Sequence, residues 1–188
     1  MIILLILLSF NFITATNLVD HKNLQLNLYL DLIKYNTQEK LGILPYILQN
    51  PKGVFLEVGT GGDPIADLLS KIPDNISPTI IASDIDSNIL KLLPTRHTVL
   101  NQYLNNINGP KLELLQLDAT KMDCFEDQSL DGINASAVVH EIISYAGGTD
   151  ALDNFFKDAL RIIKNNGVLT EKDFRFKFKK LNQNLMSF

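Results

Sequence analysis

The sequence predicts an α/β fold, a three-layer sandwich in which helices cover both faces of a mostly parallel sheet. Three observations support this prediction. Short apolar runs alternate with amphipathic helical patterns between Gly53 and Leu169, which is the order of βαβ units. A glycine-rich turn, Gly59-Thr60-Gly61-Gly62, follows the first apolar run and precedes a helical pattern. With 188 residues, the chain is long enough for one domain with its own core.

Composition and charge exclude several classes of protein. The net charge of −4 gives no overall nucleic-acid footprint. A single cysteine, Cys124, excludes an intrachain disulfide scaffold and suits a reducing compartment. No basic residue adjoins Cys124 to activate it as a nucleophile, so we interpret it as structural. The histidines (His21, His97 and His140) lack the spacing of zinc ligands, and we expect no metal site.

Residues 1–17 form an apolar leader. Its first thirteen residues are apolar apart from Ser9 and Asn11, a run shorter than the ~18–20 residues that a membrane-spanning helix needs. The run fits a secretory signal peptide, although no Lys or Arg precedes it. Two interpretations stay open. The leader is a signal or anchor segment of a secreted or membrane-attached protein, or a stray apolar N-terminus of a cytoplasmic one.

Two helices precede the first strand in our prediction. Residues 18–35 carry an apolar stripe at helical spacing, and a shorter helix covers residues 38–48 before a turn at Asn50-Pro51-Lys52-Gly53. These helices either cover the sheet or shape a ligand pocket.

The first strand is Val54–Val58, and it contains one charged residue, Glu57. A carboxylate in a buried strand needs a cation or hydrogen-bond donors beside it. A helix follows the glycine turn, with Asp63 and Pro64 suited to its cap and first turn. Strand, glycine turn and helix together form the unit that cradles a nucleotide-like cofactor. The dinucleotide fingerprint fails, however, because Pro64 stands where its third glycine belongs.

The second and third strands each end at an acid. Residues 79–83 lead to Asp84, and residues 112–117 lead to Asp118. Asp84 follows the glycine turn at about the spacing of an acid that accepts both ribose hydroxyls of a nucleoside. The alternative is that Asp84 or Asp86 caps the next helix, residues 88–93.

The second half of the chain predicts two further strands and two helices. Residues 129–136 form the fourth strand and its loop, and a helix with His140 follows. The next helix covers residues 151–164, capped by Thr149 or Asp150 and closed by Asn165-Asn166-Gly167. Val168 opens the fifth strand. The predicted buried stripe of this helix consists of Leu152, Phe155, Phe156, Ala159, Leu160 and Ile163.

The segment Glu57-Val58-Gly59-Thr60-Gly61-Gly62 resembles motif I of the class I S-adenosylmethionine-dependent methyltransferases, E/D-x-G-x-G-x-G. Asp63 departs from that pattern at the last glycine. The run ALRIIKNNGVL is similar to the helix-to-strand passage of the same family, and the resemblance spans about residues 50–174. It implies a Rossmann-like sandwich and S-adenosylmethionine as cofactor. The implied cofactor-binding residues are Glu57, Gly59, Gly61, Asp84, Asp118 and Ala119.

The resemblance also implies a role for each residue. Glu57 contacts the amino-acid end of the cofactor. Asp118 accepts from the adenine amine and the Ala119 amide donates to a ring nitrogen, unless Asp118 is a plain turn acid. His140 is the candidate catalytic base or substrate contact, because imidazole is a side chain that can take up or release a proton at physiological pH. The alternative is that His140 is a packed helix residue.

The chain departs from the family at its C-terminus. The family fold continues with a helix and an antiparallel pair of strands, and only residues 170–188 are left for them, so we expect these strands to be missing or incomplete. The expected domain is 18–174, and 175–188 is a basic, aromatic tail. Phe174, Phe176 and Phe178 alternate with basic residues, as in an edge strand whose basic face meets solvent or an acidic partner.

These observations predict methyl transfer to a small molecule or a protein. Among methyltransferases, an N/D-P-P-Y loop after the fourth strand is associated with methylation of exocyclic amines in DNA or of glutamine amides, and this chain has Asn134-Ala135-Ser136-Ala137 there. An acidic body also argues against nucleic acid. Cofactor chemistry favours the cytoplasm, and a membrane is a partner only if the leader is retained. Two alternatives stay open. One is a degenerate cofactor-binding module without turnover, and the other is a nicotinamide-dependent oxidoreductase, which Pro64 and Glu57 disfavour.

Overall fold

The computed structural model describes residues 41–61 and 63–171, and all statements below concern these residues. They belong to the second of the two units into which the chain divides, Asn36–Phe188. The predicted leader, the helix at 18–35 and the tail at 175–188 lie outside the described residues.

The described residues form a five-stranded parallel sheet with the strand order β3-β2-β1-β4-β5. The strands are β1 (Val54–Val58), β2 (Thr79–Asp84), β3 (Lys111–Gln116), β4 (Leu130–Asn134) and β5 (Ile163–Thr170). The helices are α3 (Leu44–Gln49), α4 (Asp63–Ser70), α5 (Ser87–Arg96), α6 (Asn101–Leu104), α7 (Val139–Tyr145) and α8 (Gly148–Ile162), with a 3₁₀ turn η2 at Thr98–Leu100. The predicted α/β fold with a parallel sheet is confirmed.

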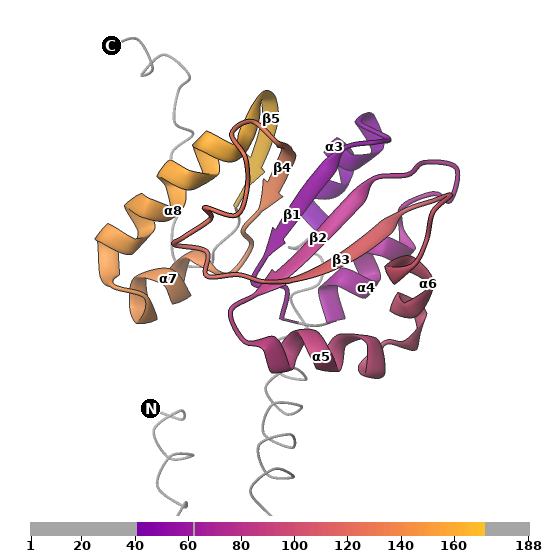
Figure 1. The fold of residues 1–188 in the computed structure, drawn as a ribbon, viewed down its shortest axis with the longest axis horizontal. Helices are drawn as coiled ribbons and strands as arrows, with labels where there is room; N and C mark the ends of the chain where they lie inside the picture. Colours follow the sequence, from indigo (N-terminus) through magenta and orange to yellow (C-terminus); the bar gives the residue numbers. More distant parts are fainter. Residues whose placement is uncertain (1–40, 62, 172–188) are drawn as a thin grey trace, which may run out of the picture. The chain divides into compact units, whose positions relative to one another are not determined.

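Helices cover both faces of the sheet (Figure 1). Alternate side chains of a strand point to opposite faces, so β1 contributes to two separate cores. Phe55 packs on one face with residues of α3, α4 and α5. Leu56 and Val58 pack on the other face with residues of α7 and α8. The fold is therefore the three-layer sandwich that the alternating pattern predicted.

The connection from β2 to α5 contains a helix cap that the sequence analysis gave as an alternative. β2 ends at Asp84, and the side chain of Asp86 accepts a hydrogen bond of 2.8 Å from the backbone N–H of Asn88. Asp86 is thus the N-cap of α5, which satisfies one of the unpaired N–H groups of the first turn. Asp86, and not Asp84, is therefore the residue that caps α5.

The boundary between α8 and β5 differs from the prediction. The helix begins at Gly148 after Gly147, without a side-chain cap from Thr149 or Asp150. It ends at Ile162, and Asn165-Asn166-Gly167 lies inside β5. The pairing of β4 with β5 is irregular there, because Leu130 pairs with Ile163 but Gly132 pairs with Val168. The extra residues form a bulge, so a sequence typical of a helix end stays within a strand.

The buried stripe of α8 is also rotated from the predicted one. Leu160 is 59% exposed, whereas Ile162 is fully buried. Ala151, Phe155 and Ala159 complete the buried stripe at spacings of about one turn. Of the predicted helix at 38–48, residues 38–40 lie outside the described residues; a 3₁₀ turn at 41–43 precedes α3, which begins at Leu44 and ends at Gln49.

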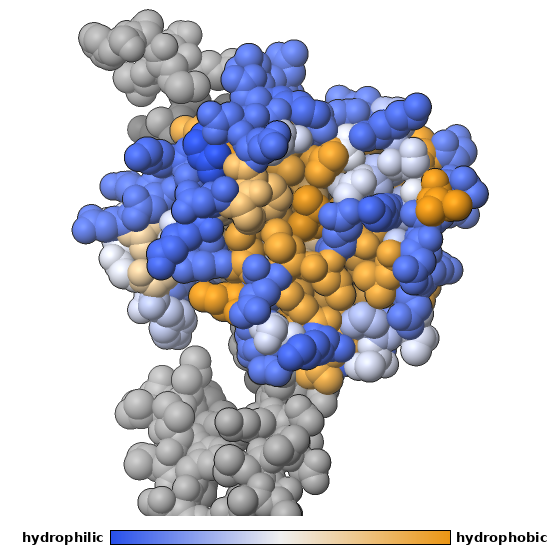
Figure 2. Space-filling view, in the orientation of Figure 1, coloured by the Kyte–Doolittle hydropathy of each residue, from blue (hydrophilic) through white to orange (hydrophobic). Residues whose placement is uncertain are grey.

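The connection from β3 to β4, residues 117–129, contains no helix in the part of the chain that the structure describes. Apolar side chains gather over the middle of the sheet on the face of the molecule that Figure 2 shows. Val54, Leu115 and Phe125 are among the half-buried apolar residues that pack against the core here. A connection without a helix leaves these side chains partly open to solvent.

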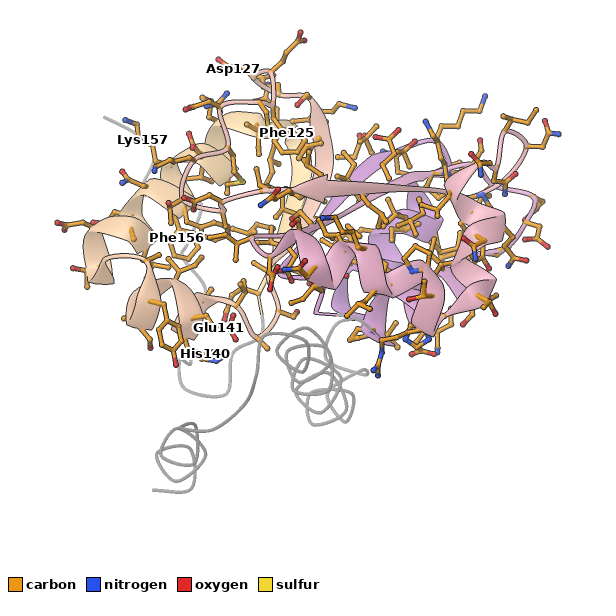
Figure 3. The ribbon with its side chains drawn as sticks, turned by 60° about the horizontal axis from the view of Figure 1, so that its bottom comes forward. Phe125, Asp127, His140, Glu141, Phe156 and Lys157 are labelled. Atoms are coloured by element: carbon orange, nitrogen blue, oxygen red, sulfur yellow. The ribbon has the colours of Figure 1, made fainter. Side chains whose placement is uncertain are left out.

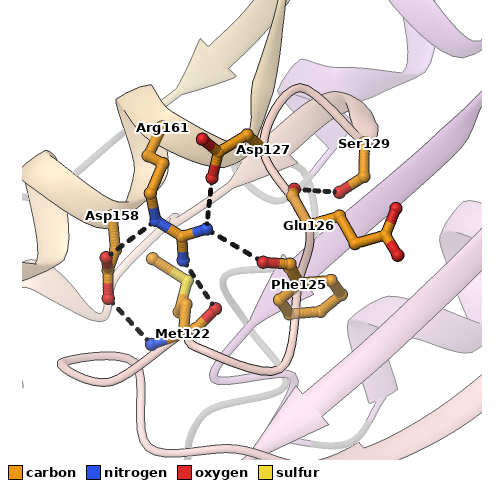
Figure 4. Close-up of polar contacts among 7 residues, drawn as sticks. All are labelled: Met122, Phe125, Glu126, Asp127, Ser129, Asp158 and Arg161. Carbon is orange, nitrogen blue, oxygen red and sulfur yellow. Dashed lines mark hydrogen bonds and ion pairs between the residues drawn. The ribbon is translucent and has the colours of Figure 1, made fainter.

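Arg161 of α8 forms hydrogen bonds with the β3–β4 connection (Figure 4). Its guanidinium donates to the carbonyl oxygens of Phe125 at 2.9 Å and Met122 at 3.0 Å, and to the carboxylate of Asp127 at 2.9 Å. Asp158, one turn away, accepts from Arg161 at 3.3 Å and from the Met122 N–H at 2.9 Å. The hydrogen bond with Asp127 raises the pKa of Arg161.

Candidate functional site

The candidate site lies at the carboxyl edge, which we define as the edge of the sheet where the parallel strands end. Ligands of open α/β sheets bind outside this edge. β1 and β2 pair in parallel, with Glu57 opposite Ala82 and Val58 opposite Ser83, so Glu57 and Asp84 reach the same edge. Glu57 is 3% exposed and Asp84 is 8% exposed. Two nearly buried carboxylates thus stand at the ends of adjacent strands.

The glycine turn runs over the end of β2. Gly59 and Gly61 adopt φ angles of +62° and +61°, in the left-handed region that favours glycine. The backbone N–H of Thr60 donates to the Ser83 carbonyl at 2.8 Å, which ties the turn to β2. A Cβ atom on Gly59 would lie 2.8 Å from Cγ2 of Val138. Glycine is therefore required at position 59 both for its φ angle and for the close approach of Val138.

Asp84 orders the turn through its side chain. Oδ2 accepts a hydrogen bond of 3.3 Å from the Gly61 N–H, and Oδ1 accepts one of 3.0 Å from the Asp86 N–H. A carboxylate has two acceptor oxygens, which is the property that an acid binding a pair of hydroxyl groups needs. Asp84 combines the spacing of a ribose-binding acid with direct contact to the glycine turn.

Asp118 follows β3, and the N–H of Leu117 donates to the Asp84 carbonyl at 3.0 Å, which brings this segment beside the end of β2. Oδ1 of Asp118 accepts from the backbone N–H of Thr120 at 3.0 Å and from its hydroxyl at 2.7 Å. Burial alone would raise the pKa of Asp118, but these hydrogen bonds and the charge of Lys121 hold it below its usual value. Asp118 therefore organises its own turn, and Ala119 beside it is half-buried.

His140 lies in the first turn of α7, and the structure leaves it half-buried (Figure 3). Its neighbours Val139 and Ile142 are the buried residues of this short helix. α7 follows the loop from β4 whose Val138 contacts Gly59, so His140 is on an element adjacent to the glycine turn. Ala137 in this loop has a φ of +60°, which is uncommon for a residue other than glycine.

Asn134 is a buried polar residue that sequence reasoning passed over. It ends β4, it is fully buried, and its amide donates to Oε2 of Glu57 at 2.6 Å. The signal was a polar residue directly after the apolar Ile133 of a buried strand. That signal is weak, because many strands end in asparagine before a turn.

A half-open cavity of about 460 Å³ lies elsewhere, at the amino ends of β1 and β4. Asp131 and Lys164 line it, together with Tyr46, Asn50 and Phe55 among others. It is at the opposite end of the strands from Glu57 and Asp84, so it is no part of the candidate site.

Other predicted features take no part in the site. Cys124 is exposed on the β3–β4 connection. Across 41–61 and 63–171, the structure contains no group of three or more metal-ligating side chains. None of the helices described is both long and apolar enough to cross a membrane.

A parallel sheet with a glycine turn after β1 and buried acids at adjacent strand ends defines the class of proteins that bind a nucleotide-like ligand at the carboxyl edge. A family profile described as "Methyltransferase domain" matches residues 56–170, which is more than half of the chain. The chain therefore belongs to the methyltransferase domain family, and the predicted class I S-adenosylmethionine-dependent methyltransferase resemblance is confirmed. A comparison with curated protein sequences gave no match.

Solved structures align with this chain, and the two with TM-scores above 0.5 share its fold. The PH0226 protein from Pyrococcus horikoshii OT3 aligns with a TM-score of 0.53 and 19% identity, over 73% of this chain and 57% of that one. A SAM dependent methyltransferase from Aquifex aeolicus aligns with a TM-score of 0.51 and 18% identity, over 77% and 70% of the two chains. A SAM-dependent methyltransferase from Methanosarcina mazei aligns at 22% identity with a TM-score of 0.46, over 63% and 52%. The chain thus spans little more than half of the Pyrococcus and Methanosarcina proteins.

Proposed function

We propose that this chain is an S-adenosylmethionine-dependent methyltransferase that binds its cofactor at the carboxyl edge. The observation that supports this most is the pair of nearly buried carboxylates, Glu57 and Asp84, at the ends of adjacent strands beside the glycine turn. Burying a carboxylate is costly unless donors compensate it. The ammonium and ribose hydroxyl groups of the cofactor are donors of the required kind.

The residues present fit such a ligand. Two backbone N–H groups hold Asp84 beside the glycine turn, and the two oxygens of a carboxylate match the two hydroxyl donors of a ribose. The hydroxyl of Thr60 is buried in the glycine turn and makes no hydrogen bond with any other described residue. A buried polar group of this kind is usually satisfied by water or a ligand.

The chain's own residues then have distinct tasks. When bound, the cofactor would supply a methyl group on a sulfonium sulfur: a bond from the acceptor to the methyl carbon would form in line with the C–S bond that breaks, and the neutral thioether would leave without protonation. The protein aligns the reactants and excludes water. Glu57 would hold the amino-acid end, and Asp118 with the Ala119 N–H would hold the adenine. His140 is the candidate to accept the proton of the methyl acceptor.

The proposed acceptor is a small molecule or a protein side chain. The loop Asn134-Ala135-Ser136-Ala137 lacks the prolines associated with methylation of exocyclic amines in DNA or of glutamine amides. A net charge of −4 also opposes binding to a phosphate backbone.

The test is calorimetry with S-adenosylhomocysteine on the full chain. Asp84→Asn keeps an oxygen for the Gly61 N–H but loses the charge, and we expect binding to weaken by on the order of 2–3 kcal/mol. Asp86→Asn is the matched control, because asparagine caps a helix as well as aspartate does. Equal affinities of both variants and the wild type would contradict the proposal.

Two further experiments on the same protein distinguish the proposed function from two other classes of function. Fluorescence titration with NADH tests the oxidoreductase hypothesis: binding of NADH without binding of S-adenosylhomocysteine would reverse our order of preference. A degenerate module would bind S-adenosylhomocysteine and yield no methylated product across a broad panel of acceptors.

A further inference from the structure

Three polar residues lie side by side at the carboxyl ends of three adjacent strands. Asn134 of β4 is the register partner of Glu57 on β1 and of Thr170 on β5. In-register parallel strands place these side chains in one row across the sheet. The row leads from β5, the outermost strand of the described sheet on this side, to the strand that precedes the glycine turn.

Hydrogen bonds fix the orientation of the Asn134 amide within this row. The hydroxyl of Thr170 donates to Oδ1 of Asn134 at 2.7 Å, and the hydroxyl of Ser136 donates to the same oxygen at 2.9 Å. Because two hydroxyl donors meet its carbonyl end, the amide presents its NH₂ group to Oε2 of Glu57, 2.6 Å away. Asn134 and Ser136 are 0% and 1% exposed, so water does not compete for these groups.

We infer that Asn134 is a positioning residue for Glu57, and that Thr170 and Ser136 hold Asn134 in the required orientation. This inference rests on the proposed cofactor site. A carboxylate that is 3% exposed keeps its charge only where donors face it, and a hydrogen bond to a charged group is shorter and stronger than a neutral one. Asn134 holds one oxygen of Glu57 and thereby directs the carboxylate toward the amino-acid end of the cofactor.

The row also couples β5 to the cofactor site. Ala135 N–H donates to the Thr170 carbonyl at 2.9 Å, so the end of β5 is bound to the loop after β4 through both backbone and side chain. A shift of β5 would turn the Asn134 amide and with it the Glu57 carboxylate. Thr170 thereby acts on cofactor affinity without touching the cofactor.

Asn134→Asp gives the sharpest test, because it replaces the donor with a second carboxylate against Glu57. Two carboxylates at this distance share one proton at low pH and repel each other once it is lost. We expect the affinity for S-adenosylhomocysteine, measured by calorimetry, to fall roughly tenfold between about pH 6 and pH 8 in this variant. The wild type should change little over the same range.

Other titratable groups on the neighbouring elements are Asp84 on β2, His140 and Glu141 on α7, and Glu171 after β5. They are present in every variant, so they cannot produce a difference between the profiles. Asn165→Asp, at an exposed position within β5, is the matched control for the added charge and should follow the wild-type profile.

Thr170 provides a second test that does not depend on the folding of Asn134→Asp. Thr170→Val removes the hydroxyl donor at constant shape, and we expect about three- to tenfold weaker binding of S-adenosylhomocysteine. Thr170→Ser keeps the hydroxyl and should restore the wild-type affinity. If wild-type protein binds the ligand and both Thr170 variants match it, or if the Asn134→Asp profile runs parallel to that of the wild type, the inference is wrong. If the wild type itself fails to bind, the proposed function fails as well.

Discussion

The carboxylate of Asp84 accepts a hydrogen bond from the backbone N–H of Gly61, 3.3 Å away, across the 23 residues that separate them in the chain. This contact joins the acid at the end of β2 to the glycine turn after β1. A ligand that binds Asp84 therefore meets a turn whose backbone is already held in place.

The first prediction concerns Gly59. Gly59→Ala should lower the free energy of unfolding by about 2–4 kcal/mol. Alanine is strained at the left-handed φ of +62°, and its Cβ atom would clash with Cγ2 of Val138 at 2.8 Å. Urea denaturation measures this change. Gly148→Ala is the control, since Gly148 has a φ of +74° but no atom within 4 Å of its Cβ position. Equal losses in the two variants would mean that contact with Val138 contributes nothing.

The second prediction concerns the residue at position 137. Ala137→Gly should raise the free energy of unfolding by about 0.5–1 kcal/mol, because glycine adopts the φ of +60° without strain. Gln128 has a φ of +50° in the β3–β4 connection, so Gln128→Gly should give a gain of similar size away from the candidate site. A loss of stability at position 137 in thermal melts would contradict the strain argument.

The third prediction concerns pH and Asp131. Its Oδ2 accepts from the Val54 N–H at 2.9 Å and from Lys164 at 2.8 Å, and its Oδ1 accepts from Asn50 at 2.8 Å. Burial alone would raise the pKa of Asp131, but the hydrogen bonds from Lys164, Val54 and Asn50 hold it below 3.8. A lowered folded-state pKa stabilises the protein above the unfolded value, and this contribution is lost as the pH falls through the folded-state pKa.

The free energy of unfolding of Asp131→Asn measures that contribution. We expect the variant to be about 1–3 kcal/mol less stable than the wild type at pH 7, with the gap closing below pH 3.8 as Asp131 of the wild type takes up a proton. Asp67→Asn removes an exposed pair with Lys71 and should cost far less. A gap of constant size from pH 7 to pH 3 would refute the linkage.

The fourth prediction concerns the β3–β4 connection. Arg161→Met removes the donors that reach Phe125, Met122 and Asp127, so the amides of residues 122–129 should exchange hydrogen faster than in the wild type. Lys157→Met, an exposed site one turn earlier on α8, is the control and should leave exchange in this segment unchanged. Unchanged exchange in Arg161→Met would show that apolar packing alone holds the connection.

Local sequence patterns predicted much of the fold. β1 was predicted at its observed bounds, Val54–Val58, because an apolar run between turn residues is a local signal. The cap at Asp86 was one of the alternatives for the same reason, since a capping side chain bonds to a backbone N–H two residues away. Prediction failed at Asn165-Asn166-Gly167, which is typical of a helix end but lies in a bulged strand. Pairing with β4, far along the chain, decided that segment.

The candidate site divides in the same way. By itself, the sequence determined which acids stand at strand ends, because Glu57, Asp84 and Asp118 lie at or near the ends of apolar runs, and such runs are a local pattern. Only the tertiary structure decided that Asn134 meets Glu57 and Thr170, residues on two other strands. The physical reason is strand register: a local pattern shows which residues end a strand, whereas their neighbours depend on how separate strands align in the sheet.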